Sequence, residues 1–183
     1  CPIVFDTRVS AGLLRHLAGA INGAAIARGT SFLKSKMGAR LFPATITIVD
    51  DPFRRRGLNS KPVDGEGIAP MRRKIIDQGV LTTWLLDLRS ARQLGLKSTG
   101  HAARGTSSPP GPSATNLYME PGQASREALL KGIERGLYVT EFIGMGVNNV
   151  TGDYSRGAAG FWIENGELAY PVSEITIAGN LRD

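Results

Sequence analysis

His16 is the clearest candidate for chemistry, because it lies in the middle of VSAGLLRHLAGAINGAAIARGTS (residues 9–31), whose apolar spacing predicts one amphipathic helix. Two histidines one helical turn apart, with a glutamate that activates water, form a common zinc motif. The positions four residues from His16 hold Gly12 and Ala20, and neither side chain can bind a metal. The local spacing therefore gives no zinc motif, and a partly buried histidine with a hydrogen-bond partner is the alternative.

The other histidine, His101, lies in a loop rich in Gly, Ser and Pro over residues 98–114. One hypothesis left open is a metal site that His16, His101 and an acid such as Asp153 form in space. A serine nucleophile would need a strained turn such as Gly-x-Ser-x-Gly, which the sequence lacks. The single cysteine, Cys1, has no histidine near it and allows no internal disulfide. We therefore predict no catalytic residue and no metal ligand in this chain.

Three polar stretches are candidates for ligand binding: residues 100–107, 115–119 and 151–160. The second, TNLYM, reads as a strand whose exposed edge could pair with an extended peptide. The alternative for each stretch is a loop or strand that satisfies its own backbone groups. The candidate substrate-binding residues in the first two stretches are His101, Arg104, Thr115, Asn116 and Tyr118.

The charge pattern bears on nucleic acid as a partner. The chain has 22 basic and 16 acidic residues, a formal net charge of +6. The densest basic clusters, residues 54–56 and 72–74, have no aromatic residues between them that would form a stacking platform. Nucleic acid is therefore not the favoured partner, and solvated loops and strand ends are the simpler interpretation.

The hydrophobic fraction of 42% is ordinary for a soluble globular protein, and the longest apolar runs are far shorter than a membrane helix needs. We expect no membrane association and no signal peptide at the first residues. One cysteine fits a reducing cytoplasm. Because the chain has no initiator methionine and no obvious stop signal, we expect it to be a piece of a longer protein, forming a single domain over residues 1–183.

The fold class predicted from the pattern of elements is α+β, with a mainly antiparallel, curved or partly closed β-sheet and two helices. The second helix should begin at Ser125 and end at Gly136. The predicted strands and hairpins cover residues 1–6, 44–51, 72–87 with a turn at 77–79, 115–120, 137–146, 160–172 with a turn at 165–166, and 173–180. SARQLG, residues 90–95, should add a short helical turn.

Three glycines fall inside the first predicted helix, at Gly12, Gly19 and Gly23. Each costs about 1 kcal/mol of helix stability relative to alanine. This cost predicts that another backbone segment passes close to the helix.

The chain is similar, over essentially all its residues, to the C-terminal part of the TldD/PmbA family. The resemblance rests on long stretches: VFDTRVSAGLLRHLAGAINGAAIARGTSFL, ITIVDDP, VLTTWLLDLRSARQLGLKSTGHAARGTSSPPGPSATNLYM and GMGVNNVTGDYSRGAAGFWIENGELAYPVSEITIAGNL. One branch of the family carries His-Glu-x-x-x-His on a helix, binds zinc with a further cysteine and cuts peptides. The PmbA-like branch lacks these ligands and forms a heterodimer with a TldD-like subunit.

The resemblance places the first histidine of that motif on Arg15, the glutamate on His16 and the second histidine on Ala20. None of the three is kept, and an arginine at a ligand position would repel a dication. The resemblance thus implies that this chain belongs to the PmbA-like branch and holds no cofactor, with zinc in the TldD-like partner. Arg15 and His16 would then face the peptide cavity and bind a peptide terminus or carboxylate.

The function implied by the resemblance is that of a bacterial cytoplasmic, non-catalytic subunit that holds unfolded peptides beside the partner's zinc. The family is linked to proteolytic maturation of a peptide antibiotic and degradation of an antitoxin, and carries the label "modulator of DNA gyrase". A dimer of two copies of this chain is the alternative assembly. A regulatory protein that binds DNA or gyrase, and a stand-alone metallopeptidase, are the alternative functions.

Overall fold

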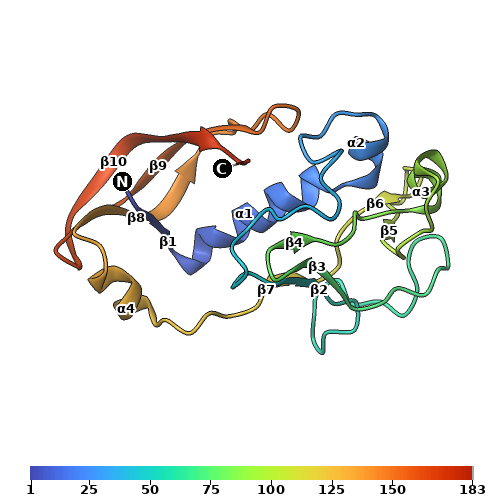
Figure 1. Ribbon diagram of the computed structural model, residues 1–183, viewed down its shortest axis with the longest axis horizontal. Coiled ribbons are helices and arrows are strands. Elements are labelled where there is room, and N and C mark those ends of the chain that lie inside the picture. Colours follow the sequence, from blue (N-terminus) through green and yellow to red (C-terminus); the bar gives the residue numbers. More distant parts are fainter. Residues whose placement is uncertain (183) are drawn as a thin grey trace. The chain divides into compact units, whose positions relative to one another are not determined.

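The computed structural model describes residues 1–182. Within this part of the chain there are four helices and mainly antiparallel sheets, and none of these sheets closes into a barrel (Figure 1). The predicted α+β fold class is therefore confirmed. The contacts form two compact units, one from Cys1–Leu13 with the chain from Gly122 onward, and one from Leu14–Pro121. The single domain over residues 1–183 stays a prediction.

The first unit contains a four-stranded sheet in the order β1-β8-β9-β10. β1 is parallel to β8, whereas the other neighbours are antiparallel. Asn165 and Gly166 join β9 to β10 with φ values of 49° and 84°, so the predicted two-residue turn is confirmed. The strand bounds are Ile3–Phe5 for β1, Arg135–Ile143 for β8, Asp153–Glu164 for β9 and Glu167–Asn180 for β10.

Helix α4 of the first unit spans Arg126–Lys131 and begins at Ser125, whose hydroxyl accepts a hydrogen bond from a backbone N–H, as predicted. The predicted end at Gly136 is wrong. The helix stops at Gly132, and Gly136 instead lies in β8, beside the backbone of β1. A Cβ at Gly136 would lie 2.8 Å from the Pro2 carbonyl oxygen, so glycine allows the two strands to meet here.

Helix α1 spans Thr7–Ala20. Asp6 immediately precedes it, and its side chain caps the first turn. Asp6 Oδ1 accepts hydrogen bonds from the backbone N–H and the Nε of Arg8, both at 2.9 Å. Asp6 Oδ2 accepts a hydrogen bond from the Tyr138 hydroxyl at 2.6 Å. The hydrogen bond from the Arg8 side chain, followed by that from Tyr138, holds the pKa of Asp6 far below its ordinary value of 3.8.

The depressed pKa of Asp6 predicts a pH-dependent share of stability. Ionised Asp6 stabilises the fold above its ordinary pKa, and this contribution is lost as the pH falls through the lower folded value. In urea unfolding, wild type should exceed Asp6→Asn in stability near pH 6, and the gap should narrow below about pH 4. A gap that stays constant between these pH values would show that the Asp6 contacts do not favour its ionised form.

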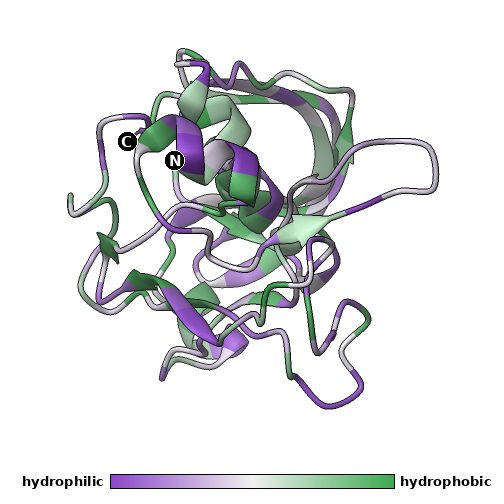
Figure 2. Cartoon of the chain, turned by 90° about the vertical axis from the view of Figure 1, so that its right-hand side faces the viewer, coloured by the Kyte–Doolittle hydropathy of each residue, from purple (hydrophilic) through white to green (hydrophobic). Residues whose placement is uncertain are grey.

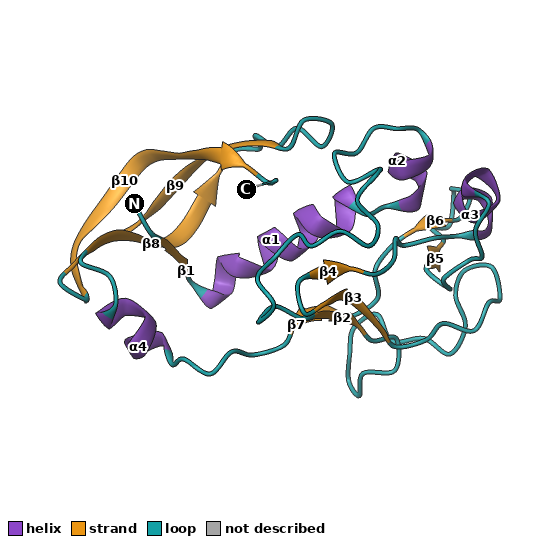
Figure 3. Ribbon diagram, viewed as in Figure 1, coloured by secondary structure: helices purple, strands orange, loops and turns teal. Residues whose placement is uncertain are grey.

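The second unit contains a four-stranded antiparallel sheet in the order β4-β3-β2-β7 and a separate two-stranded sheet, β5-β6. Much of this unit is loop, as Figure 3 shows. The predicted hairpin is confirmed: Gln78 and Gly79, with φ values of 47° and 83°, join β3 to β4. The strands are β2 (Ile48–Asp50), β3 (Arg73–Asp77), β4 (Val80–Leu81), β5 (Ala102–Ala103), β6 (Gly111–Pro112) and β7 (Leu117–Met119).

Two short helices belong to this unit, α2 (Gly23–Ala27) and α3 (Leu88–Leu94). The prediction of one continuous helix over residues 9–31 is wrong, because α1 ends at Ala20 and α2 begins after Asn22. Asn22 Oδ1 accepts hydrogen bonds from the N–H groups of Ala24 and Ala25, at 3.0 and 3.3 Å. Such a side chain satisfies the free N–H groups of a new helix, and therefore starts one.

The glycines of this region behave differently from one another. A Cβ at Gly23 would lie 2.6 Å from the carbonyl oxygen of Leu85, and the Gly23 N–H donates to that oxygen at 2.8 Å. Close backbone approach is therefore confirmed at Gly23. The prediction of close backbone approach is wrong for Gly12 and Gly19, because no other described segment lies within 4 Å of a Cβ added there.

Replacing Asn22 tests the helix start. Asn22→Ala should lower the free energy of unfolding by about 1–2 kcal/mol, because two α2 N–H groups lose their acceptor. The Asn22 Nδ2 also donates to the Pro112 carbonyl at 2.8 Å. Asn22→Asp keeps the acceptor but loses this donor, so it should retain part of the stability that alanine loses. Chemical unfolding of the three proteins measures both effects, and equal stability for alanine and wild type would contradict this account of the cap.

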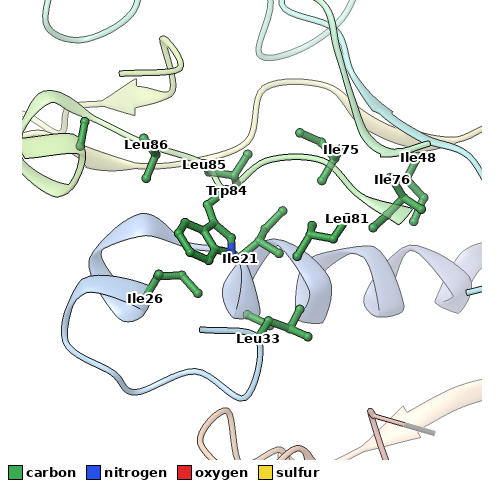
Figure 4. Packing of buried hydrophobic residues seen from close by; sticks show 12 residues of the cluster. Ile21, Ile26, Leu33, Ile48, Ile75, Ile76, Leu81, Trp84, Leu85 and Leu86 are labelled. Atoms are coloured by element: carbon green, nitrogen blue, oxygen red, sulfur yellow. The ribbon is translucent and has the colours of Figure 1, made fainter. Parts of the chain in front are cut away.

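The core of the second unit forms where the end of α1 and α2 pack against the β-hairpin and the Trp84–Leu86 segment (Figure 4). Ile21, Ile75, Ile76 and Leu81 are wholly buried there. Each such side chain contributes about 1.5–3 kcal/mol by leaving water. The helical ribbons in Figure 2 carry both hydrophilic and hydrophobic colours. None of the helices in residues 1–182 has the length and apolar character needed to cross a membrane.

Candidate functional site

Strand β7 is the outer strand of its sheet, so the predicted strand edge is confirmed for Leu117–Met119, whereas Thr115 and Asn116 lie just before the strand. It pairs with β2 on one side, in the register Asp50↔Leu117, Val49↔Tyr118 and Ile48↔Met119. On its other side, β7 has no strand partner within the described residues. An unpaired strand side offers a row of backbone donors and acceptors to another chain.

The backbone of β7 alternates in the direction of its polar groups. Just before β7, the N–H of Asp51 donates to the carbonyl of Asn116 at 3.2 Å. In an antiparallel ladder, residues that exchange hydrogen bonds alternate with residues whose N–H and C=O groups point the other way. The register therefore directs those groups of Leu117 and Met119 away from β2. We call this outer side of β7, from Leu117 to Met119, the open edge.

A buried polar cluster holds the start of β7 in place. Asp50 is 0% exposed, and its Oδ1 accepts a hydrogen bond from the Thr115 N–H at 2.8 Å. Its Oδ2 accepts hydrogen bonds from the Thr115 hydroxyl at 2.5 Å and from His101 Nε2 at 3.1 Å. The other ring nitrogen of His101, Nδ1, lies 2.7 Å from the Thr99 hydroxyl. We call Asp50, Thr99, His101 and Thr115 the Asp50 cluster.

The burial of His101 decides its role. Its side chain is 1% exposed, and both ring nitrogens are engaged within the Asp50 cluster. A buried polar group with satisfied hydrogen bonds fixes local geometry, and leaves no free face for a ligand. We therefore assign His101 the positioning of Asp50 and Thr115 in place of direct contact with a substrate.

Asn116 fastens a loop to the strand. Its Nδ2 donates to the Asp51 carbonyl at 2.7 Å and to the Ser60 hydroxyl at 3.0 Å. Its Oδ1 accepts a hydrogen bond from the Asn59 N–H at 3.2 Å. A Cβ at Gly57 would lie only 2.6 Å from Asn116 Oδ1, so a larger residue at position 57 would displace the Asn116 side chain. Residues 51–60 are thereby held beside β7.

Tyr118, the central residue of β7, contacts two arginines. Its hydroxyl accepts a hydrogen bond from Arg72 Nη2 at 3.2 Å, and the guanidinium of Arg54 lies 4.8 Å from the centre of its ring. The hydrogen bond to Tyr118 and the electrostatic interaction with it, and then the charges of Asp51 and Glu120, raise the pKa of Arg72. Two positive groups thus stand against the one aromatic side chain of β7.

Four of the predicted residues, His101, Thr115, Asn116 and Tyr118, are brought together at β7 and the Asp50 cluster. Arg15 is exposed and His16 is half-buried on α1, and Arg104 is exposed in the loop after β5. That Arg15, His16 and Arg104 bind substrate stays a prediction. Residues that sequence reasoning missed are Asp50, Arg54 and Arg72. The basic clusters were the only signal for the two arginines, and their aromatic partner is distant in sequence.

The helix position where the resemblance puts a metal does not fit one. Ala20 carries only a methyl group and is wholly buried, and Arg15 carries a positive charge. Within residues 1–182, no group of three or more His, Cys, Asp or Glu side chains is arranged to hold a metal ion. We derive no catalytic step through zinc in this chain.

The stand-alone metal site of His16, His101 and Asp153 also lacks support. Both ring nitrogens of His101 are occupied, as described above. Asp153 is engaged as well, because its Oδ2 accepts from the Thr151 hydroxyl at 2.5 Å and its Oδ1 accepts from Asn180 Nδ2 at 2.9 Å.

The fold and this chain's sequence together define a class of protein. All 183 residues match the family model described as the PmbA/TldA metallopeptidase C-terminal domain. The chain therefore belongs to the PmbA/TldD metallopeptidase family, and the resemblance seen in the sequence is confirmed.

Individual relatives show how similar this chain is to known members of the family. The metalloprotease PmbA of Escherichia coli O157:H7 is 50% identical over 183 residues, which is 100% of this chain and 38% of that protein. TldE from Thermococcus kodakarensis has a similar structure, with a TM-score of 0.87 and 28% identity over 98% of this chain and 41% of that one. A candidate modulator of DNA gyrase from Thermotoga maritima has a TM-score of 0.89 and 35% identity, over 98% of this chain and 41% of that one. The chain thus spans 38–41% of the length of these relatives.

Proposed function

We propose that this chain belongs to the non-catalytic, peptide-holding subunit of a heterodimeric zinc metallopeptidase. A TldD-like partner supplies the zinc and the catalytic groups, and this chain holds an unfolded peptide beside them. The observation that carries the proposal is the open edge of β7, with the backbone groups of Leu117 and Met119 directed outward. An extended peptide can add to such an edge as another strand, through main-chain hydrogen bonds that do not depend on its sequence.

The surroundings of the open edge support this role. The Asp50 cluster fixes Thr115 at the start of β7, and Asn116 fixes the neighbouring loop. A strand held in this way loses little conformational entropy when a peptide binds, which favours binding. Unfolded peptides are the substrates that such an edge can accept, because a folded protein has few free backbone groups. Maturation of a peptide antibiotic and degradation of an antitoxin are reactions in which such an edge would serve.

The absence of a fitting metal position on α1 supports the division of labour between two chains. Arg15 and Ala20 stand where the resemblance puts the two histidines, so in this proposal the partner supplies the groups that bind zinc. Arg15 and His16 would then contact the peptide's terminus or a carboxylate, as proposed from their position on α1.

Reconstitution tests the proposal. Three samples should be compared: the full-length protein that contains this chain, the TldD-like subunit, and the complex of the two. The complex is formed by mixing the two proteins and is isolated by size-exclusion chromatography. Cleavage of an unfolded peptide should occur only in the heterodimer and should stop on addition of a chelator. Analytical ultracentrifugation of the same samples separates heterodimers from dimers of this protein. Chelator-sensitive cleavage by the full-length protein alone would overturn the proposal.

A regulatory protein that binds DNA or gyrase is the second candidate function. The exposed basic residues 54–56 are the observation in its favour. Binding that depends mainly on phosphate contacts would fall steeply as salt rises. Retention on duplex DNA at low salt, and loss of that retention with moderate salt, would support this candidate.

A further inference from the structure

Strand β7, which carries the open edge, is contacted by a loop rich in arginine. Residues 51–60 are fastened to the strand by Asn116, and this loop carries Arg54, Arg55 and Arg56, all exposed. Arg72 approaches the same strand from the start of β3 and donates to the Tyr118 hydroxyl. The hydrogen bonds of Asn116 thus hold a basic segment, distant in sequence, against the start of β7, and Arg54 of this segment lies over the Tyr118 ring.

The acidic residues near these arginines already form ion pairs with Arg72. Asp51 and Glu120 both lie 3.7 Å from Arg72, and each forms a weak ion pair with it. No acidic side chain within residues 1–182 forms an ion pair with the arginines at 54–56. An uncompensated group of exposed positive charges attracts a negatively charged ligand, most strongly at low ionic strength.

The pleat of the sheet decides which peptide side chain meets these charges. Side chains of neighbouring strands that lie opposite one another project to the same face. A peptide residue opposite Tyr118 would therefore project to the face where Arg54 covers the tyrosine ring at 4.8 Å and Arg72 bonds its hydroxyl. The peptide residues on either side, opposite Leu117 and Met119, would project to the other face.

From this juxtaposition we propose that the open edge selects extended peptides that carry an acidic side chain in register with Tyr118. The inference rests on the proposed function, and adds the substrate class to it. A carboxylate at this position would project to the face that carries the guanidinium of Arg54, and a guanidinium binds a carboxylate well through paired N–H donors. Nucleic acid fits less well, because Arg54 already occupies one face of the only aromatic ring on β7.

Fluorescence anisotropy of labelled peptides tests the selection. The full-length heterodimer would be titrated into three probes: an unfolded peptide with one central glutamate, the same peptide with glutamine, and a single-stranded oligothymidylate. The glutamate peptide should bind about fivefold more tightly than the glutamine peptide at low salt, and this ratio should approach one at high salt. A catalytically inactive TldD-like partner keeps both peptides intact.

A matched pair of variants locates the effect. Arg54→Gln should reduce the preference for glutamate to less than about twofold, because the charge over Tyr118 is removed. Arg89→Gln makes the same charge change on the exposed side of α3 and should leave the preference intact. Both residues are exposed, so both variants should fold as wild type does.

The outcomes separate this inference from the proposed function. If the glutamate and glutamine peptides bind equally, or if Arg54→Gln keeps the preference, the acidic selection is wrong while peptide binding stands. If neither peptide binds, both proposals fail. Tighter binding of the oligothymidylate than of the glutamate peptide would overturn the acidic selection and would favour a nucleic-acid partner.

Discussion

Replacing Met119 by proline is expected to lower peptide cleavage by the heterodimer by about tenfold or more, with the fold intact. The Met119 N–H points to the open edge, so its removal costs β7 no hydrogen bond to β2. Proline is tolerated on the free side of an edge strand for this reason. For an added peptide strand, however, it removes one donor and introduces a ring at the contact, and a tenfold loss corresponds to about 1.4 kcal/mol.

Met119→Val is the matched control for the proline variant, because it also shortens the side chain but keeps the N–H. Met119 is 51% exposed, so neither change creates a core cavity. The valine variant should cleave within about twofold of wild type, and thermal unfolding should show both variants folded. Cleavage by the proline variant at the rate of the valine variant would exclude strand pairing at this edge.

Asp50→Asn is expected to lower the free energy of unfolding by about 3 kcal/mol. The wholly buried Asp50 carboxylate accepts three hydrogen bonds, two from Thr115 and one from His101. An amide of the same shape has one acceptor and turns two donors toward those groups, so at least one buried donor stays unpaired. The loss should also reduce peptide cleavage, because Thr115 would no longer fix the start of β7.

Asp77→Asn provides the control for Asp50. Asp77 also belongs to this sheet, but it is 41% exposed and forms a surface ion pair with Lys74 at 2.8 Å. Its replacement should cost less than about 0.5 kcal/mol. Urea unfolding at neutral pH measures both variants. Similar, small losses for the two aspartates would show that the Asp50 cluster is not a major support of the strand.

Local signals in the sequence predicted the elements that depend on local chemistry. The turns at Gln78-Gly79 and Asn165-Gly166 need residues that accept positive φ, and these residues marked both hairpins. Ser125 marked the start of α4. The end of α4 was missed, because Gly136 reads as a helix stop, whereas its actual place is set by contact with β1.

The break in the first predicted helix could not be read from periodicity alone. Apolar residues continue at helical spacing across Ile21 and Asn22, so the pattern favours one helix. The chain bends there because Gly23 docks on the Leu85 carbonyl, and Asn22 caps the new helix. This contact joins segments about sixty residues apart, and the sequence gives no register for it.

In the candidate site too, the local features could be predicted and the contacts between distant segments could not. TNLYM was recognisable as a strand with polar side chains, and β7 is indeed an edge strand. The Asp50 cluster was not predicted, because it joins residues from three distant segments and buries a histidine that looked like a loop residue. The Tyr118 contacts with Arg54 and Arg72 also depend on the sheet register, which composition does not reveal.

The measurement that tests the central claim most directly is the zinc content of the full-length protein. The protein would be purified without its partner, incubated with zinc, dialysed and analysed by mass spectrometry, beside a TldD-like subunit treated in the same way. We predict stoichiometric zinc in the TldD-like subunit and none retained by the protein that contains this chain. Stoichiometric zinc that is lost when His16 is replaced by alanine would contradict the account.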